Sequence, residues 1–194
     1  MEFAHDTQVV LAAAASLVNS ALAEPDPLDD TVDLAVFEAW MAEQPYTGTR
    51  ARTAAERTAV RALRARIAAF WPAEPDGDAG AGAPDRDRLV ELVNTLLDET
   101  DARPRLARHD GWDWHLHVST ARAPLADRMG AEIAMSVADL VRGDDVSRLR
   151  RCAGEDCAAV LVDLSRNRSK RFCDTGNCAN RAHVAAYRRR LRRS

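Results

Sequence analysis

The sequence predicts a mostly helical N-terminal domain that carries one β-hairpin, an α+β arrangement, followed by a small C-terminal module. Three observations predict this fold class. Several segments before residue 147 repeat apolar side chains at helical spacing. One pair of short alternating segments flanks an Asp-Gly dipeptide, which is typical of a hairpin. All four cysteines lie after residue 151, so the end of the chain has a chemistry of its own.

Two helices are predicted in the first fifty residues. The first begins at Asp6 or Thr7 and ends near Ala23, before the helix-breaking segment 24–27 with its two prolines. The second is expected to begin at Thr31, which is a suitable N-cap. Its apolar side chains are predicted to share one face, namely Val32, Ala35, Val36, Ala39 and Trp40.

A third helix is predicted from about Thr53 to Phe70. Val60, Leu63, Ile67 and Phe70 repeat at spacings of three and four, and three arginines are expected on its solvent side, namely Arg57, Arg61 and Arg64. Residues 73–84 consist mainly of Ala, Pro, Gly and Asp, which predicts a flexible linker. A fourth helix should follow over residues 85–99, with a leucine-rich stripe.

A β-hairpin is predicted where residues 105–109 and 112–118 flank Asp110-Gly111, a dipeptide that favours a two-residue turn. Alternation places one set of side chains on a face that we expect to be apolar, namely Trp112, Trp114, Leu116 and Val118. The other face, which we expect to be solvated, has Asp113, His115, His117 and Ser119. Two imidazoles on one face could hold a metal, but a pair of ligands is too few for a site. A long helix should then run from Pro124 to about Val141.

Charge divides the chain more sharply than length does. Residues 148–194 have thirteen basic and four acidic side chains, a balance of +9, whereas residues 1–147 have a balance of −12. The net charge of −3 therefore conceals an acidic body and a basic tail, which suggests that the tail binds a polyanion. We predict two domains, a helix-rich regulatory domain over 1–147 and a second unit over 148–194.

The N-terminal segment predicts a cytoplasmic protein. Residues 9–18 are apolar, but the residues before them are acidic or neutral, and the apolar segment is about half as long as a membrane span. We therefore expect no membrane association. In the reducing cytoplasm, a cluster of four cysteines favours a bound metal over disulfides, which are the main alternative.

The cysteine spacing predicts one structural Zn²⁺ ion. Cys152-x4-Cys157 and Cys173-x4-Cys178 each supply two thiolates from one tight turn, and the spacer lets the chain double back. Residues 158–164 and 170–172 are predicted to pair as strands, and a final helix runs from Cys178 to Leu191 with an apolar stripe facing that hairpin. This order of turn, hairpin, turn and helix is that of a treble-clef-like zinc finger.

The basic residues of the tail form two clusters, one in the turn before Cys173 and one on the final helix. Arginine and asparagine are also the residue types that read guanine and adenine edges. The predicted nucleic-acid contacts are Arg166, Arg168, Lys170, Arg188, Arg189 and Arg192 to phosphates, and Asn180 and Arg181 either to bases or within the finger. The other interpretations are a solvated, arginine-rich C-terminus and, for some arginines, charge compensation of the zinc thiolates.

At these residues the chain resembles the CGNR-type zinc-finger family. Asp163-x-Ser165-Arg166-Asn167, Arg171-x-Cys173 and Cys178-Ala179-Asn180-Arg181 match its motifs, with Ala179 in place of the signature glycine. Leu17-Val18-Asn19-Ser20 is similar to a motif in the family's N-terminal helix. The resemblance implies a bacterial stress-related transcription regulator whose finger binds DNA.

These observations together predict a zinc-dependent regulator that binds double-stranded DNA, with an N-terminal domain that either dimerises or responds to a small-molecule effector. We expect no enzymatic activity, because four thiolates leave zinc no open position. Two alternatives remain: a zinc-finger module that binds a protein without binding DNA, and an RNA-binding protein. The second is weakened by the few aromatic side chains in the tail.

Overall fold

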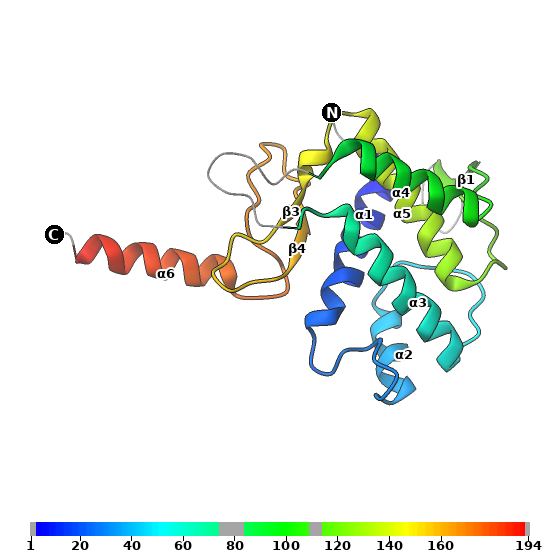
Figure 1. Cartoon of the computed structure of the whole chain (residues 1–194), viewed down its shortest axis with the longest axis horizontal. Helices are drawn as coiled ribbons and strands as arrows, with labels where there is room; N and C mark the ends of the chain where they lie inside the picture. Colours follow the sequence, from blue (N-terminus) through cyan, green and yellow to red (C-terminus); the bar gives the residue numbers. More distant parts are fainter. Residues whose placement is uncertain (1–2, 74–83, 109–113, 193–194) are drawn as a thin grey trace.

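The computed structural model describes residues 3–73, 84–108 and 114–192. The predicted linker, except for its two end residues, and the predicted turn at residues 110–111 lie outside these ranges. The described chain confirms the predicted fold class, since it is mostly helical with two small antiparallel hairpins (Figure 1). No helix in the described ranges is long and apolar enough to cross a membrane.

The described part of the body contains five α-helices: α1 (His5–Asn19), α2 (Leu34–Ala42), α3 (Ala54–Ile67), α4 (Arg86–Glu99) and α5 (Leu125–Arg142). Short 3₁₀ turns extend α1 (Ser20–Leu22) and α3 (Ala68–Phe70). Helix α5 is the centre of the core, because it packs against α1, α3 and α4. Its side chains Met129, Ile133, Val137 and Leu140 are completely buried.

Side-chain caps fix where three of these helices begin. Thr53 accepts a hydrogen bond from the amide of Glu56, and Asp85 accepts from the amide of Arg88. Asp33, not Thr31, caps α2 through the amide of Ala35. This shift corrects the predicted face of α2: Phe37 and Met41 are its buried side chains.

Two arginines on α3 also differ from the prediction of a solvent-facing side. Arg57 is buried and donates to the carbonyl oxygens of Val32 (2.6 Å) and Asp30 (3.1 Å). Arg64 forms two hydrogen bonds of 2.8 Å with the carboxylate of Asp26. The loop between α1 and α2 therefore covers this side of α3, a long-range contact that helical periodicity does not reveal.

The first hairpin pairs β1 (Arg105–Ala107) with β2 (His115–His117) in antiparallel register, with Leu106 opposite Leu116. Its predicted apolar face is buried only in part: Val118 is 2% exposed, whereas Trp114 is 64% exposed, and Trp112 lies outside the described residues. His115 and His117 instead line a cavity between β2, α1 and α5. Alternation establishes that a strand has two faces, but it does not establish which face meets the body.

The second hairpin joins the body to the C-terminal module. A 3₁₀ turn (Val146–Arg148) leads into β3 (Leu149–Arg151), which pairs with β4 (Val160–Val162), so the strand partner of 158–164 precedes it and is not 170–172 as predicted. Val160 and Val162 belong to the main core, whereas Leu161 packs with the cysteines. Strand β4 is therefore shared between the two parts of the molecule.

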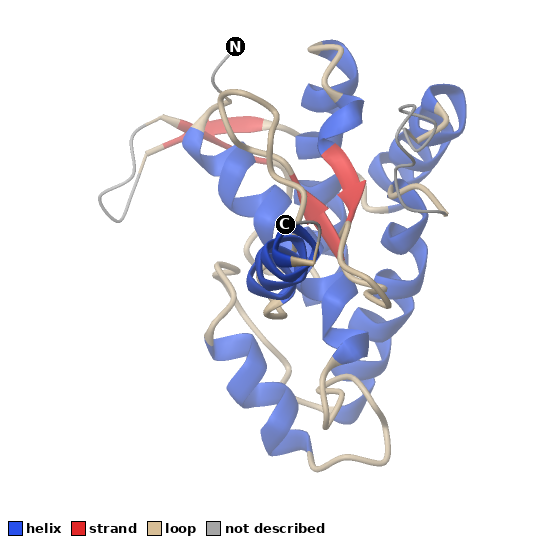
Figure 2. Cartoon of the chain, turned by 90° about the vertical axis from the view of Figure 1, so that its left-hand side faces the viewer, coloured by secondary structure: helices blue, strands red, loops and turns tan. Residues whose placement is uncertain are grey.

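The last helix, α6 (Cys178–Leu191), projects from the body (Figure 1). In Figure 2 it is seen end-on, pointing towards the viewer. The predicted packing of its apolar stripe on the hairpin is wrong, because Val184, Tyr187 and Leu191 are 47%, 56% and 59% exposed. Only Cys178 of this helix is buried.

Candidate metal centre and basic surface

The four cysteines converge on one point. Their Sγ atoms all lie within 4.8 Å of one another, at 3.8 Å for Cys157–Cys173 and 3.9 Å for Cys173–Cys178. A tetrahedral Zn²⁺ ion with Zn–S bonds of about 2.3 Å requires S···S edges of about 3.8 Å. A disulfide requires about 2.05 Å, and all four cysteines are free. The donor set and its spacing therefore fit one structural zinc ion.

Hydrogen bonds prepare these sulfurs to carry negative charge. The amides of Gly154 and Cys173 donate to Cys152 Sγ at 3.4 and 3.3 Å. Arg181 donates from Nη2 to Cys178 Sγ at 3.0 Å. Four thiolates around Zn²⁺ leave a formal charge of −2, which these donors offset.

Gly154 is a residue that the sequence analysis missed. A Cβ atom at this position would lie 2.8 Å from Cys178 Sγ, so the first cysteine turn approaches α6 too closely for any side chain. The signal in the sequence was a glycine two positions after the first cysteine, in the middle of the Cys152-x4-Cys157 turn. Only glycine permits this approach.

The cysteines differ in acidity when no metal is bound. Burial raises the pKa of the Cys152 thiol to about 12. For Cys173, burial acts in the same direction but is outweighed by hydrogen bonds from the Thr175 hydroxyl and the Gly176 amide, which lower its pKa to about 7. Metal binding must therefore displace protons from the finger, so zinc affinity rises with pH.

Comparison with family models agrees with this geometry. Residues 11–144 match the ABATE model, described as "Putative stress-induced transcription regulator". The chain belongs to the ABATE family. Residues 148–191 match the CGNR zinc finger, and the four clustered cysteines in this segment are consistent with one structural zinc ion. No curated protein matches the chain.

The first basic cluster of the CGNR finger is partly neutralised. Arg168 forms an ion pair of 2.6 Å with the buried Asp145, and Lys170 forms one of 2.6 Å with Asp174. Arg166 is exposed. The cluster therefore presents less charge than its sequence suggests.

Asp163 holds the loop that carries this cluster. Its buried carboxylate accepts hydrogen bonds from the amides of Ser165 (3.0 Å) and Lys170 (2.9 Å). Arg148, also buried, donates to the carbonyl oxygens of Asp163 (2.7 Å) and Ser165 (3.0 Å). The Asp-x-Ser motif thus has a structural role in shaping the loop.

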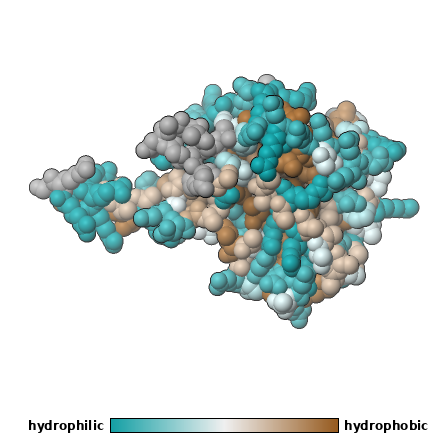
Figure 3. Space-filling model, in the orientation of Figure 1, coloured by the Kyte–Doolittle hydropathy of each residue, from teal (hydrophilic) through white to brown (hydrophobic). Residues whose placement is uncertain are grey.

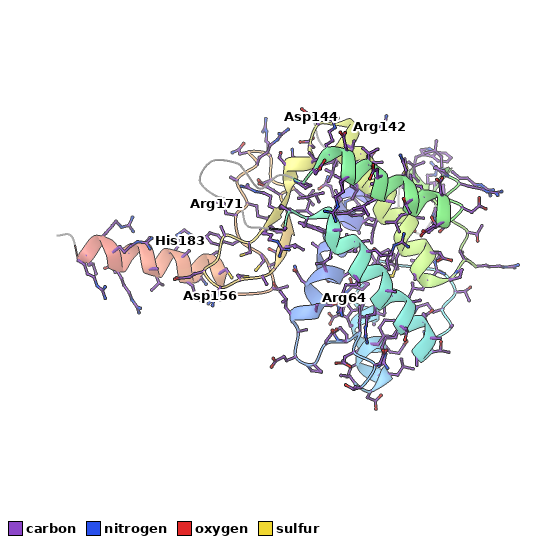
Figure 4. All side chains as sticks on the ribbon, in the orientation of Figure 1. Arg64, Arg142, Asp144, Asp156, Arg171 and His183 are labelled. Atoms are coloured by element: carbon purple, nitrogen blue, oxygen red, sulfur yellow. The ribbon has the colours of Figure 1, made fainter. Side chains whose placement is uncertain are left out.

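The second basic cluster lies on α6. Arg188, Arg189 and Arg192 are exposed, and the projecting helix is mainly hydrophilic in Figure 3. Asn180 is exposed in the first turn, whereas Arg181 is directed to the zinc site by its hydrogen bond to Cys178. His183 lies on the same helix, away from the body (Figure 4). The two basic clusters are therefore separated in space, one on the loop and one on the helix.

The ABATE part contains a cavity of about 150 Å³ between β2, α1 and α5. Its polar lining includes Thr7, His115, His117, Glu132, Ser136 and Asp139. Burial raises the pKa of the Glu132 carboxyl to about 7, although the charges of Arg128 and His115 act in the opposite direction. The cavity therefore combines two imidazoles with a carboxyl group removed from bulk solvent.

Proposed function

We propose that the protein is a zinc-dependent transcription regulator whose CGNR finger binds double-stranded DNA. The observation that supports this proposal is the position of α6. Its first residue, Cys178, belongs to the four-cysteine cluster, and its far end presents Arg188, Arg189 and Arg192 to solvent. Fourteen helical residues extend about 21 Å, and the major groove of DNA admits a helix.

The proposed division of labour places regulation in residues 1–147 and DNA binding in residues 148–194, in the cytoplasm. The negative balance of the first part would repel DNA, which leaves the basic finger as the contacting surface. We propose no catalytic role, because the zinc coordination sphere is filled by thiolates. Arg166 and the exposed arginines of α6 would contact phosphates, and Asn180 would contact a base.

Salt dependence of binding tests this proposal. We would measure the affinity of the full zinc-loaded chain for a duplex at several salt concentrations, first with genomic fragments to find a preferred sequence. The logarithm of affinity should fall steeply with the logarithm of salt concentration. Replacing Arg188, Arg189 and Arg192 with glutamine should reduce the slope by about 2.7, since each phosphate contact contributes about 0.9.

A matched control removes the same charge elsewhere. Arg86, Arg103 and Arg142 are exposed arginines of the body, and their replacement by glutamine changes the net charge equally. This variant should keep the original slope. The proposal would be contradicted if the DNA affinity of the unaltered protein did not change with salt concentration. It would also be contradicted if both triple variants reduced the salt slope equally.

One observation favours the alternative of a protein-binding finger. Val184, Tyr187 and Leu191 form an exposed apolar stripe on α6, which is more typical of a protein contact than of a phosphate contact. On this alternative, Tyr187→Ser would abolish capture of a partner protein, while the arginine variants would change little. Retention of duplex DNA by the Tyr187→Ser variant, with its salt slope intact, would favour DNA binding.

A further inference from the structure

The cavity in the ABATE part has the chemistry of a second metal site. His115 and His117 occupy positions i and i+2 of β2, so their rings project from the same face of the strand. Their Nε2 atoms lie 3.1 Å apart, with ring planes inclined at 53°. The two nitrogens therefore lie close enough together to bind one ion.

This separation suits a shared metal ion. Two imidazole nitrogens bound at about 2.05 Å to one metal, with an angle of about 98° between the bonds, lie about 3.1 Å apart. Without a metal, the same contact is a hydrogen bond in which one ring donates and the other accepts, according to the tautomer. Imidazole is a preferred ligand of zinc, nickel, copper and iron.

A carboxylate faces the histidine pair from the other side. Glu132 projects from α5 into the same cavity, and its side chain is largely buried. The charges of Arg128 and His115 both act on this carboxyl group, so His115 and Glu132 face the same space. The guanidinium of Arg128 donates to the carbonyl oxygens of Thr49 and Ala123.

We propose that His115 and His117 bind a divalent transition-metal ion in this cavity, and that Glu132 completes the site. In the described ranges, only the four cysteines bring three or more ligand atoms within 4.8 Å of one another. Glu132 therefore reaches the ion through a bound water or after a change of rotamer. Asp139 and Asp6, which also line the cavity, add negative charge that favours a cation.

The position of the cavity links it to the finger. Helix α1 lines the cavity near Thr7 and ends at Asn19, which is hydrogen-bonded to β4. Helix α5 carries Glu132 and continues through the 3₁₀ turn to β3. An ion held between β2 and α5 would act on both helices that support the β3–β4 hairpin. Control of DNA affinity by this metal is a consequence that rests on the proposed function.

Cobalt titration of the full chain tests the site. After zinc has filled the finger, one further equivalent of Co²⁺ should bind, without the intense thiolate-to-cobalt absorption of a cysteine site. His115→Gln and His117→Gln should each weaken this binding at least about tenfold. The control His183→Gln, which removes an exposed imidazole on α6, should leave it unchanged.

A second measurement keeps the test valid if a cavity variant fails to fold. In the unaltered protein, paramagnetic Co²⁺ should broaden the ring resonances of His115 and His117 but not those of His183. Three results would overturn the proposed site. They are the failure of a second equivalent of Co²⁺ to bind, thiolate-to-cobalt absorption from that second equivalent, and line broadening confined to His183. If the protein binds the second metal but does not bind DNA, the metal site stands and the proposed function is refuted. If it binds DNA but no second metal, the proposed function stands and the metal site is refuted.

Discussion

Asn19 is predicted to be the main polar link between the body and the finger. Its side-chain amide donates to the carbonyl oxygen of Val160 at 2.8 Å and accepts from the amide of Val160 at 2.8 Å. The side chain thus occupies the place of a neighbouring strand along the outer edge of β4. Both residues are buried, so water cannot replace the two bonds without a change in packing.

The expected loss in Asn19→Ala follows from this geometry. The substitution leaves one donor and one acceptor of Val160 without partners, and each buried unsatisfied group costs about 1–3 kcal/mol. The free energy of unfolding should therefore fall by about 2–6 kcal/mol. The gain in helix propensity from alanine is at most about 0.7 kcal/mol and cannot offset this loss.

Asn94 provides a matched control. It lies in Leu92-Val93-Asn94-Thr95, which resembles Leu17-Val18-Asn19-Ser20, and it is also on a helix, but its side chain is exposed. Urea unfolding followed by circular dichroism should show a change within about 0.5 kcal/mol for Asn94→Ala. A loss below about 1 kcal/mol for Asn19→Ala, or equal losses for the two variants, would refute the assigned role of Asn19.

Two further substitutions test the finger. In Gly154→Ala, the new Cβ would lie 2.8 Å from Cys178 Sγ, so zinc affinity measured by chelator competition should fall at least about tenfold. In the control Gly176→Ala, the new Cβ would lie 3.4 Å from the same sulfur, and zinc affinity should fall less. An equal loss at both glycines would contradict the steric argument. Asp163→Ala removes the carboxylate that accepts from Ser165 and Lys170, so the free energy of unfolding should fall by about 3–5 kcal/mol. Asp174→Ala, at an 84% exposed side chain, is the control, and similar stability of the two variants would show that the loop does not depend on Asp163.

Local signals were sufficient to predict most elements and the clustering of the four cysteines. Helical periodicity identified the buried stripe Val60, Leu63 and Ile67 of α3, and the four-cysteine spacing identified the metal centre. These signals are local because a helix buries one stripe and because each cysteine pair lies within a single turn. Neither depends on where the rest of the chain lies.

Which side chains are buried by contacts with distant parts of the chain could not be predicted from local patterns. Arg57 has the spacing of a surface residue, but the loop between α1 and α2 covers it and supplies two carbonyl oxygens. The histidine face of β2 turns inward because α1 and α5 present hydroxyl and carboxyl groups there, while Trp114 remains outside. In each case at least one deciding partner, the loop between α1 and α2 or helix α1, is more than twenty residues away in the sequence.

Strand β4 gives a physical reason to treat the two family segments as one mechanical unit. Alternation along three residues sends Val160 and Val162 into the core of the body and Leu161 towards the cysteines. Trp71, from the end of α3, fixes the same strand by donating to the carbonyl oxygen of Leu161 at 2.9 Å. A shift of α1 or α5 therefore cannot leave β4 in place without breaking buried contacts, and β4 cannot move without displacing the wall of the zinc site. Because a closely packed interior transmits strain, a shift of α1 or α5 in the body would also displace the first residues of α6.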